Sequence, residues 1–192
     1  MAYKVGDARK REIISTAMRL FTEKGYEQTS LRDIAKEANI ALGLCYHYFD
    51  SKQKLFQEAM NVYVEDYCHD FIIYLHTKDN SLEEKLHYLY DKILNEEQDA
   101  SYHSFFHQAE NEEMHKQLSL KFCDYMIPHL LAALQHDEEQ YHYKIKDPLK
   151  LVSFITYGQI PFVSAHVAPN AKDIQTIKEY ISILLQSQRI PE

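Results

Sequence analysis

Apolar residues recur every three or four positions along most of the 192-residue chain, which is the spacing of amphipathic α-helices. One such stripe covers residues 9–24, and Gly25 then supplies a residue type that commonly ends a helix. A longer stripe covers residues 51–76 and is almost wholly aromatic or sulfur-bearing on one face. The same spacing predicts further helices over residues 82–97, 101–110, 115–135, 148–166 and 171–188. The pattern therefore predicts an all-α fold.

Between the first and the long helix, two short helix patterns meet at a corner. Ser30 is a good helix cap, and Asp33 three positions later forms a short-armed version of the capping box. Asn39 tolerates a left-handed turn, and a second helical segment, residues 42–49, follows almost at once. The spacing is that of a helix-turn-helix, in which the second helix enters the DNA major groove.

The composition agrees with a helical protein and adds a division of charge. Only four glycines and five prolines occur, fewer than turn-rich β folds use, and no apolar run of eighteen residues suggests a membrane span. The net charge is −8, yet residues 1–54 carry 10 basic and 7 acidic residues. A basic N-terminal part followed by an acidic remainder is typical of a protein that binds nucleic acid with one end. We expect a cytoplasmic protein with no membrane contact.

The segments REIISTAMRLFTEKGYEQTSLRDIAKEANI, ALGLCYHYF and SKQKLF closely resemble the N-terminal region of the tetracycline-repressor (TetR) family of bacterial transcription factors. The resemblance covers about residues 9–60. It implies a three-helix DNA-binding domain over residues 1–52, and a helical ligand-binding and dimerisation domain over residues 53–192. Three positions depart from the family pattern: Asn39 replaces a glycine, Ala41 a capping serine, and Leu42 a polar residue.

The resemblance assigns DNA-contact roles to particular side chains. By this resemblance, four residues face the groove: Leu42, Gly43, Tyr46 and His47. Four others lie near a phosphate or the groove edge: Ser30, Arg32, Tyr48 and Lys52. A helix N-terminus beside a lysine, as at Lys52, is a natural phosphate site. The alternatives are ordinary ones: Tyr46 packs in the core, and Arg32 and Lys52 are solvated surface charges. Phe49 is expected to be a core residue.

The resemblance also implies a homodimer through the last two helices, 148–166 and 171–188, and a small-molecule effector bound by the C-terminal domain. Reading two half-sites of a near-palindromic operator requires such a dimer. We expect a repressor that a hydrophobic or aromatic effector releases, with no cofactor and no catalytic residues. The residues proposed to line its pocket share an apolar, mostly aromatic character, and plain core packing is the alternative for all of them: Tyr63, Tyr67, Phe71, Phe105, Phe106, Phe122, Met126, Tyr157 and Phe162.

Two other functions compete for the same residues. Three Glu-x-x-His elements, ending at His87, His115 and His142, match the pattern of ferritin-like di-metal oxidases or oxygenases. His103 and His107 lie one helical turn apart and could share a zinc ion. The other alternative is a helical small-molecule-binding protein that does not bind DNA. Three unpaired cysteines, in turn, suit buried reduced thiols better than disulfides or a metal site.

Overall fold

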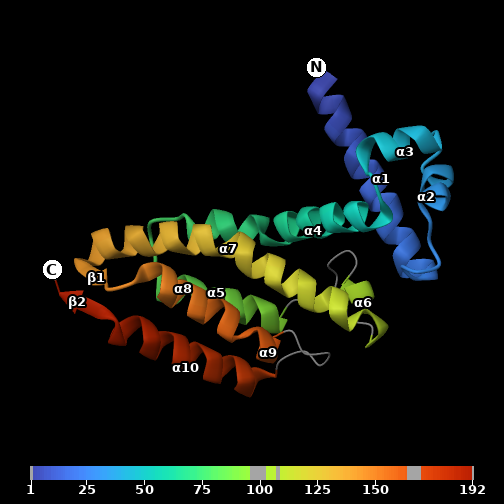
Figure 1. Ribbon diagram of the computed structural model, residues 1–192. Helices are drawn as coiled ribbons and strands as arrows, with labels where there is room; N and C mark the ends of the chain where they lie inside the picture. The colour runs from blue at the N-terminus through green and yellow to red at the C-terminus, as the bar shows by residue number, and fades with distance from the viewer. Residues whose placement is uncertain (1, 96–102, 107–108, 164–169, 192) are drawn as a thin grey trace. The chain divides into compact units, whose positions relative to one another are not determined.

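The computed structural model describes residues 2–95, 103–106, 109–163 and 170–191. The fold is all-α apart from two short strands, as the periodicity predicts (Figure 1). The elements in chain order are α1 (Ala2–Lys24), α2 (Leu31–Glu37), α3 (Leu42–Tyr48), α4 (Lys52–Leu75), α5 (Leu82–Asn95), α6 (His103–Phe106), the 3₁₀ turn η1 (Ala109–Asn111), α7 (Glu112–Tyr141), β1 (Tyr143–Ile145), α8 (Pro148–Gly158), α9 (Ile160–Val163), α10 (Ala171–Ser187) and β2 (Arg189–Pro191).

The chain forms two compact units. Unit 1 consists of residues 1–63 and 100–108, and unit 2 of residues 64–99 and 109–192, so the division falls inside α4. The functional boundary at residue 52 is a different division and stays a prediction. In unit 1, α2 packs against both α1 and α3, and α6 packs against α1. Its core contains fully buried Ile13, Phe21, Ile34, Leu55 and Phe105.

Unit 2 is a helical bundle closed by a two-stranded antiparallel sheet. Its main helix pairs are α7 with α8 and α5 with α10, which lie side by side in Figure 1. The sheet pairs β1 with β2, with Lys144 opposite Ile190. The sequence pattern misses both strands because each has only three residues, too few to display an alternating pattern.

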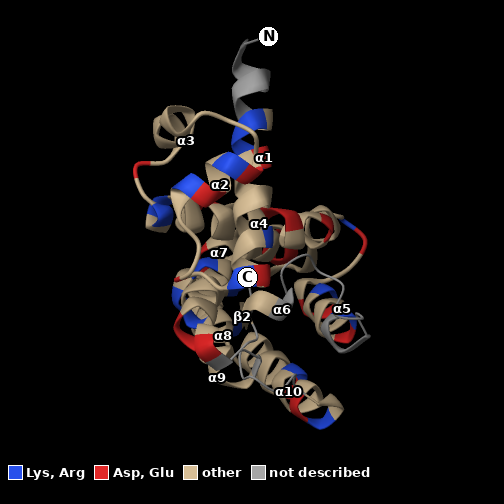
Figure 2. Ribbon diagram, turned by 90° about the vertical axis from the view of Figure 1, so that its right-hand side faces the viewer, with Lys and Arg blue, Asp and Glu red and all other residues tan. Residues whose placement is uncertain are grey.

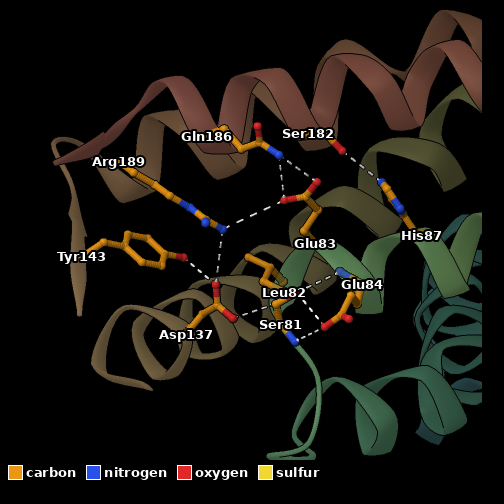
Figure 3. Close-up of polar contacts among 10 residues, drawn as sticks. All are labelled: Ser81, Leu82, Glu83, Glu84, His87, Asp137, Tyr143, Ser182, Gln186 and Arg189. Carbon is orange, nitrogen blue, oxygen red and sulfur yellow. Dashed lines mark hydrogen bonds and ion pairs between the residues drawn. The ribbon is translucent and has the colours of Figure 1, made fainter. Parts of the chain in front are cut away.

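A buried polar network joins the sheet to the start of α5 (Figure 3). The Asp137 carboxylate on α7 accepts hydrogen bonds from the backbone N–H of Leu82, at 2.8 Å, and from the Tyr143 hydroxyl, at 2.5 Å. The Arg189 guanidinium on β2 lies 4.0 Å from Asp137 and from Glu83. Burial and the neighbouring Asp137 raise the pKa of Tyr143, so its hydroxyl remains a proton donor. The network links three segments that lie far apart in sequence: the start of α5, the consecutive elements α7 and β1, and β2.

Two expected helices differ from the structure. In the segment 101–110 the described residues form the short α6 and the start of η1, and residues 101, 102, 107 and 108 lie outside the described residues. The segment 148–166 divides into α8 and α9 around Gln159. Pro161 accounts for this break, because its ring lacks an N–H and clashes with the carbonyl four residues earlier.

Two expectations about composition can be compared with the fold. The three cysteines are buried free thiols, as the sequence predicts, and burial raises the pKa of Cys68 to about 12. Within the described residues, every helix is either too short or too polar to cross a lipid bilayer.

Candidate nucleic-acid interface

Helix α2 begins with the cap that the sequence predicts. The Ser30 hydroxyl accepts a hydrogen bond from the Asp33 backbone N–H at 3.2 Å, and the Asp33 carboxylate accepts one from the Ser30 backbone N–H at 2.9 Å. These reciprocal bonds form a capping box. Hydrogen bonds from the Ser30 side chain and backbone lower the pKa of Asp33. The carboxylate therefore stays ionised and holds the first turn of α2.

The corner between α2 and α3 is built on Asn39. Its φ of 52° is left-handed, a conformation that asparagine tolerates better than most residues. The Ile40 N–H then donates to the Ala35 carbonyl at 2.9 Å, which closes the end of α2. Helix α3 follows after Ala41, which provides no side-chain cap. The predicted helix-turn-helix is thus present, with the weak cap that the sequence indicates.

Helix α3 has one face in the core and one in solvent. Cys45 is fully buried and Phe49, just after the helix, is 1% exposed, so these two side chains anchor it. Tyr46 is 51% exposed in the single chain, so the alternative that it packs in the core is wrong. His47 is also exposed, and a side chain at Gly43 would have open space around it. These three residues therefore lie where a major groove can approach α3 closely.

The remaining predicted contacts lie at the edges of this face. Leu42 and Tyr48 are half-buried at the two ends of α3, and Arg32 is exposed on α2. Figure 2 shows Lys and Arg on α1 and α2 of the same unit. Two of the α1 cations already have carboxylate partners: Arg9 lies 2.6 Å from Glu12, and Lys10 lies 2.9 Å from Glu58.

Lys52 has a structural role that the sequence pattern does not reveal. Its ammonium donates a hydrogen bond to the Tyr26 carbonyl at 2.8 Å and lies 4.2 Å from the centre of the Tyr26 ring. The Glu27 carboxylate is 3.9 Å away. The side chain thus ties the first turn of α4 to the loop between α1 and α2. Its contact with a phosphate stays a prediction.

This contact gives a stability prediction. Lys52→Met keeps the apolar stem and removes the charged donor, so we expect unit 1 to lose about 1.5 kcal/mol of unfolding free energy. Lys54→Met is the matched control, because Lys54 is an exposed i,i+4 partner of Glu58 and should change stability by less than about 0.5 kcal/mol. Urea unfolding monitored by circular dichroism measures both. If both variants lose the same unfolding free energy, the hydrogen bond from Lys52 to Tyr26 does not stabilise unit 1.

The residues proposed for effector binding are divided between the two units. In unit 1, Phe105 and Phe106 are buried against Phe56, with ring centres 6.0 and 6.1 Å from it, and Tyr63 contacts Phe106. No local pattern reveals this placement, because α6 lies about 40 residues beyond the rest of unit 1 in sequence.

In unit 2 the candidate residues have several surroundings. Tyr67 and Phe122 are in ring contact at 5.8 Å, and the hydroxyl of Tyr157 donates a hydrogen bond to Asp124. Phe71 and Met126 are buried, whereas Phe162 on α9 is 60% exposed. An effector-binding role for these residues, as for those in unit 1, stays a prediction.

The metal-centre alternatives find little support in the described residues. There, no three His, Cys, Asp or Glu side chains come close enough together to share a metal ion. Glu84 instead caps α5 by accepting a hydrogen bond from the Ser81 backbone at 2.8 Å, and His87 lies 3.1 Å from the Ser182 hydroxyl (Figure 3). The paired-histidine idea at 103 and 107 lies partly outside the described residues, because it includes His107.

The capped α2, the left-handed corner and the exposed face of α3 together define a helix-turn-helix DNA-binding domain. Residues 13–59 match the family model described as bacterial regulatory proteins, tetR family. The chain is 39% identical over 90 residues to the HTH-type transcriptional regulator YuxN of Bacillus subtilis. This match covers 45% of the chain and 31% of YuxN. The chain is 36% identical over 90 residues to IcaR of Staphylococcus aureus, a negative regulator of the biofilm operon icaADBC, covering 46% of this chain and 48% of IcaR. The matches therefore span about half or less of these relatives.

Solved structures resemble the whole chain in fold. A TetR-family transcriptional regulator from Streptomyces coelicolor aligns with a TM-score of 0.64 at 16% identity, covering 94% of this chain and 99% of that one. RolR in complex with resorcinol aligns with a TM-score of 0.62 at 21% identity, covering 97% and 90%. Residues 13–59 thus match the DNA-binding region of the TetR family of transcriptional regulators, and the fold of the chain resembles that of solved TetR-family structures. The names of YuxN, IcaR and the Streptomyces coelicolor protein describe transcriptional regulators.

Proposed function

We propose that the chain is a ligand-responsive repressor that binds a near-palindromic operator as a homodimer and is released by a small hydrophobic or aromatic effector. The observation that carries the proposal is the solvent face of α3, where Tyr46 and His47 are exposed above the buried anchors Cys45 and Phe49. A phenol and an imidazole on one short helix can both donate hydrogen bonds to base edges and contact thymine methyl groups. Such a regulator acts on DNA in the cytoplasm.

Two similar proteins support the proposed sign of regulation and the proposed class of effector. IcaR, which is similar to 46% of the chain, is a negative regulator, and this favours repression here. RolR shares the fold and holds resorcinol as its ligand, which supports a small-molecule effector. Tyr67, Phe71, Phe122 and Met126 on α4 and α7 are the candidates in unit 2 for contacting the effector.

Dimerisation is supported by apolar side chains that unit 2 leaves uncovered on its last helices. Phe154 on α8 is 67% exposed, and Tyr180 and Ile183 lie three positions apart on one face of α10 with similar exposure. Helices α8 and α10 contact each other, so a second copy can cover both. Large exposed apolar side chains on neighbouring helices are typical of a protein interface. We therefore assign the homodimer interface to these helices.

Operator binding tests the proposed reading helix directly. Duplexes selected from a random pool should share a near-palindromic site, and Tyr46→Ala or His47→Ala should each lower affinity for it by about ten- to hundredfold, the effect of losing one good base contact. Folding and dimerisation should stay unchanged, because both side chains are exposed. Electrophoretic mobility shift at fixed salt measures the loss.

A matched control separates this effect from the removal of any surface aromatic. Tyr141→Ala deletes a comparably exposed tyrosine at the end of α7 in unit 2, and it should leave operator affinity unchanged. If both α3 variants bind as tightly as the wild type, the reading helix is wrongly assigned. If no duplex is enriched at all, the alternative of a helical binding protein without DNA affinity gains support.

A further inference from the structure

Two histidines of unit 2 face each other, one at the end of α4 and the other on α7. His76 follows the last residue of α4, and its Nε2 lies 3.3 Å from Nδ1 of His129 on α7. The two rings meet nearly edge to face, at 73° with centres 5.6 Å apart. His76 is exposed and His129 half-buried, so solvent reaches one side of the pair. This pair has no role in the proposed repressor mechanism.

The separation of the two nitrogens has a chemical meaning. Two nitrogens bound to one zinc ion at about 2.0–2.1 Å, with a tetrahedral angle between them, lie about 3.3 Å apart. Two nitrogens bound at right angles, as in square-planar copper or nickel sites, would lie only about 2.9 Å apart. The 3.3 Å separation is compatible with a tetrahedral ion between the two nitrogens, and in the metal-free pair it is the length of a hydrogen bond.

We propose that His76 and His129 together bind one zinc ion, with water in the two remaining positions, and that the ion links the end of α4 to α7. Imidazole nitrogens are among the usual zinc ligands, and a site with open positions can accept water or an anionic ligand. The proposal concerns two protein ligands. It is therefore compatible with the finding that no three metal-binding side chains gather in the described residues.

The protonation of the pair suits this role. In the metal-free pair, one ring donates the N–H between Nε2 and Nδ1, and metal binding requires that proton to move to the other nitrogen of the same ring. The neutral imidazole ring is the form that binds metal, and it is populated at pH 7.5 for an ordinary histidine. The Tyr125 ring lies 5.5 Å from the His129 ring, centre to centre, and packs beside the pair.

Zinc chloride titrated into the full chain at pH 7.5 tests the proposal by isothermal calorimetry. We expect one zinc site per chain whose affinity falls at least tenfold in His76→Gln and also in His129→Gln. His69→Gln is the matched control. His69 is exposed on α4 about 10 Å before His76 along the helix, too far to share the ion, so this variant should bind zinc as the wild type does.

A second readout tests the link between the helices. Zinc in excess should raise the thermal unfolding temperature of the wild type and of His69→Gln, and leave both pair variants unchanged, since ligand binding to the folded state stabilises it. Zinc affinity that is equal in all four proteins would overturn the proposal and move the metal to another of the 11 histidines. Neither measurement involves DNA, so failure of the operator-binding proposal would leave this test intact.

Discussion

Replacement of Asp137 by leucine is expected to lower the unfolding free energy of unit 2 by about 3 kcal/mol or more. Asp137 is only 4% exposed, and its carboxylate accepts hydrogen bonds from the Leu82 backbone and from the Tyr143 hydroxyl. Leucine fills a similar volume but leaves both buried donors without their acceptor, and it removes one of the two carboxylates near Arg189. Removing one partner of a buried charged network typically costs 3–5 kcal/mol. Urea unfolding monitored by circular dichroism gives the value.

Two further variants show whether the network itself is responsible. Tyr143→Phe removes one donor and leaves the carboxylate bonded to Leu82, so we expect a smaller loss of about 1 kcal/mol. Glu139→Leu, two positions along α7, replaces an exposed carboxylate and should change stability by less than about 0.5 kcal/mol. Comparable losses at Asp137 and Glu139 would mean that the carboxylate contributes only through helix charge.

The network shows why part of the fold cannot be predicted from sequence. Asp137 lies in a polar stretch that indicates a solvated helix end, and its partners Leu82 and Arg189 are each more than 50 residues away. A hydrogen bond between such distant groups depends on tertiary packing, which no local spacing encodes. The same reason applies to the pairing of β1 with β2 and to Phe105 and Phe106, which join the core of unit 1 from a separate segment.

The helix-turn-helix could be predicted almost completely because each of its parts is local. The Ser30 cap depends on a residue three positions away, and the left-handed φ of Asn39 is a property of that residue type. The burial of Phe49 is what the family resemblance implies. Lys52 is the exception, because its long side chain can reach either a phosphate or the Tyr26 carbonyl, and only the fold shows the second contact. The sequence spacing places Lys52 at the start of α4, but it does not determine which group the ammonium contacts.

Replacement of Phe154 by glutamate is expected to convert the proposed dimer into folded monomers. Phe154 is 67% exposed on α8, so the substitution removes no core contact of the single chain. In an apolar interface, however, a carboxylate loses its hydration without gaining a partner, and aromatic residues at such positions commonly contribute 2 kcal/mol or more to association. We expect the dimer dissociation constant to rise at least hundredfold in sedimentation equilibrium, with circular dichroism unchanged.

The same variant should also bind its operator at least a hundredfold more weakly, because one α3 helix reads only one half-site and two linked copies read both together. Ile73→Glu is the matched control. Ile73 is 59% exposed on α4, which has no main packing contact with α8 or α10 among the described residues, so the same change from apolar to charged should leave both dimer and operator binding intact. A Phe154→Glu protein that stays dimeric would place the interface elsewhere. A monomer that still binds the operator tightly would instead show that one copy is enough to read it.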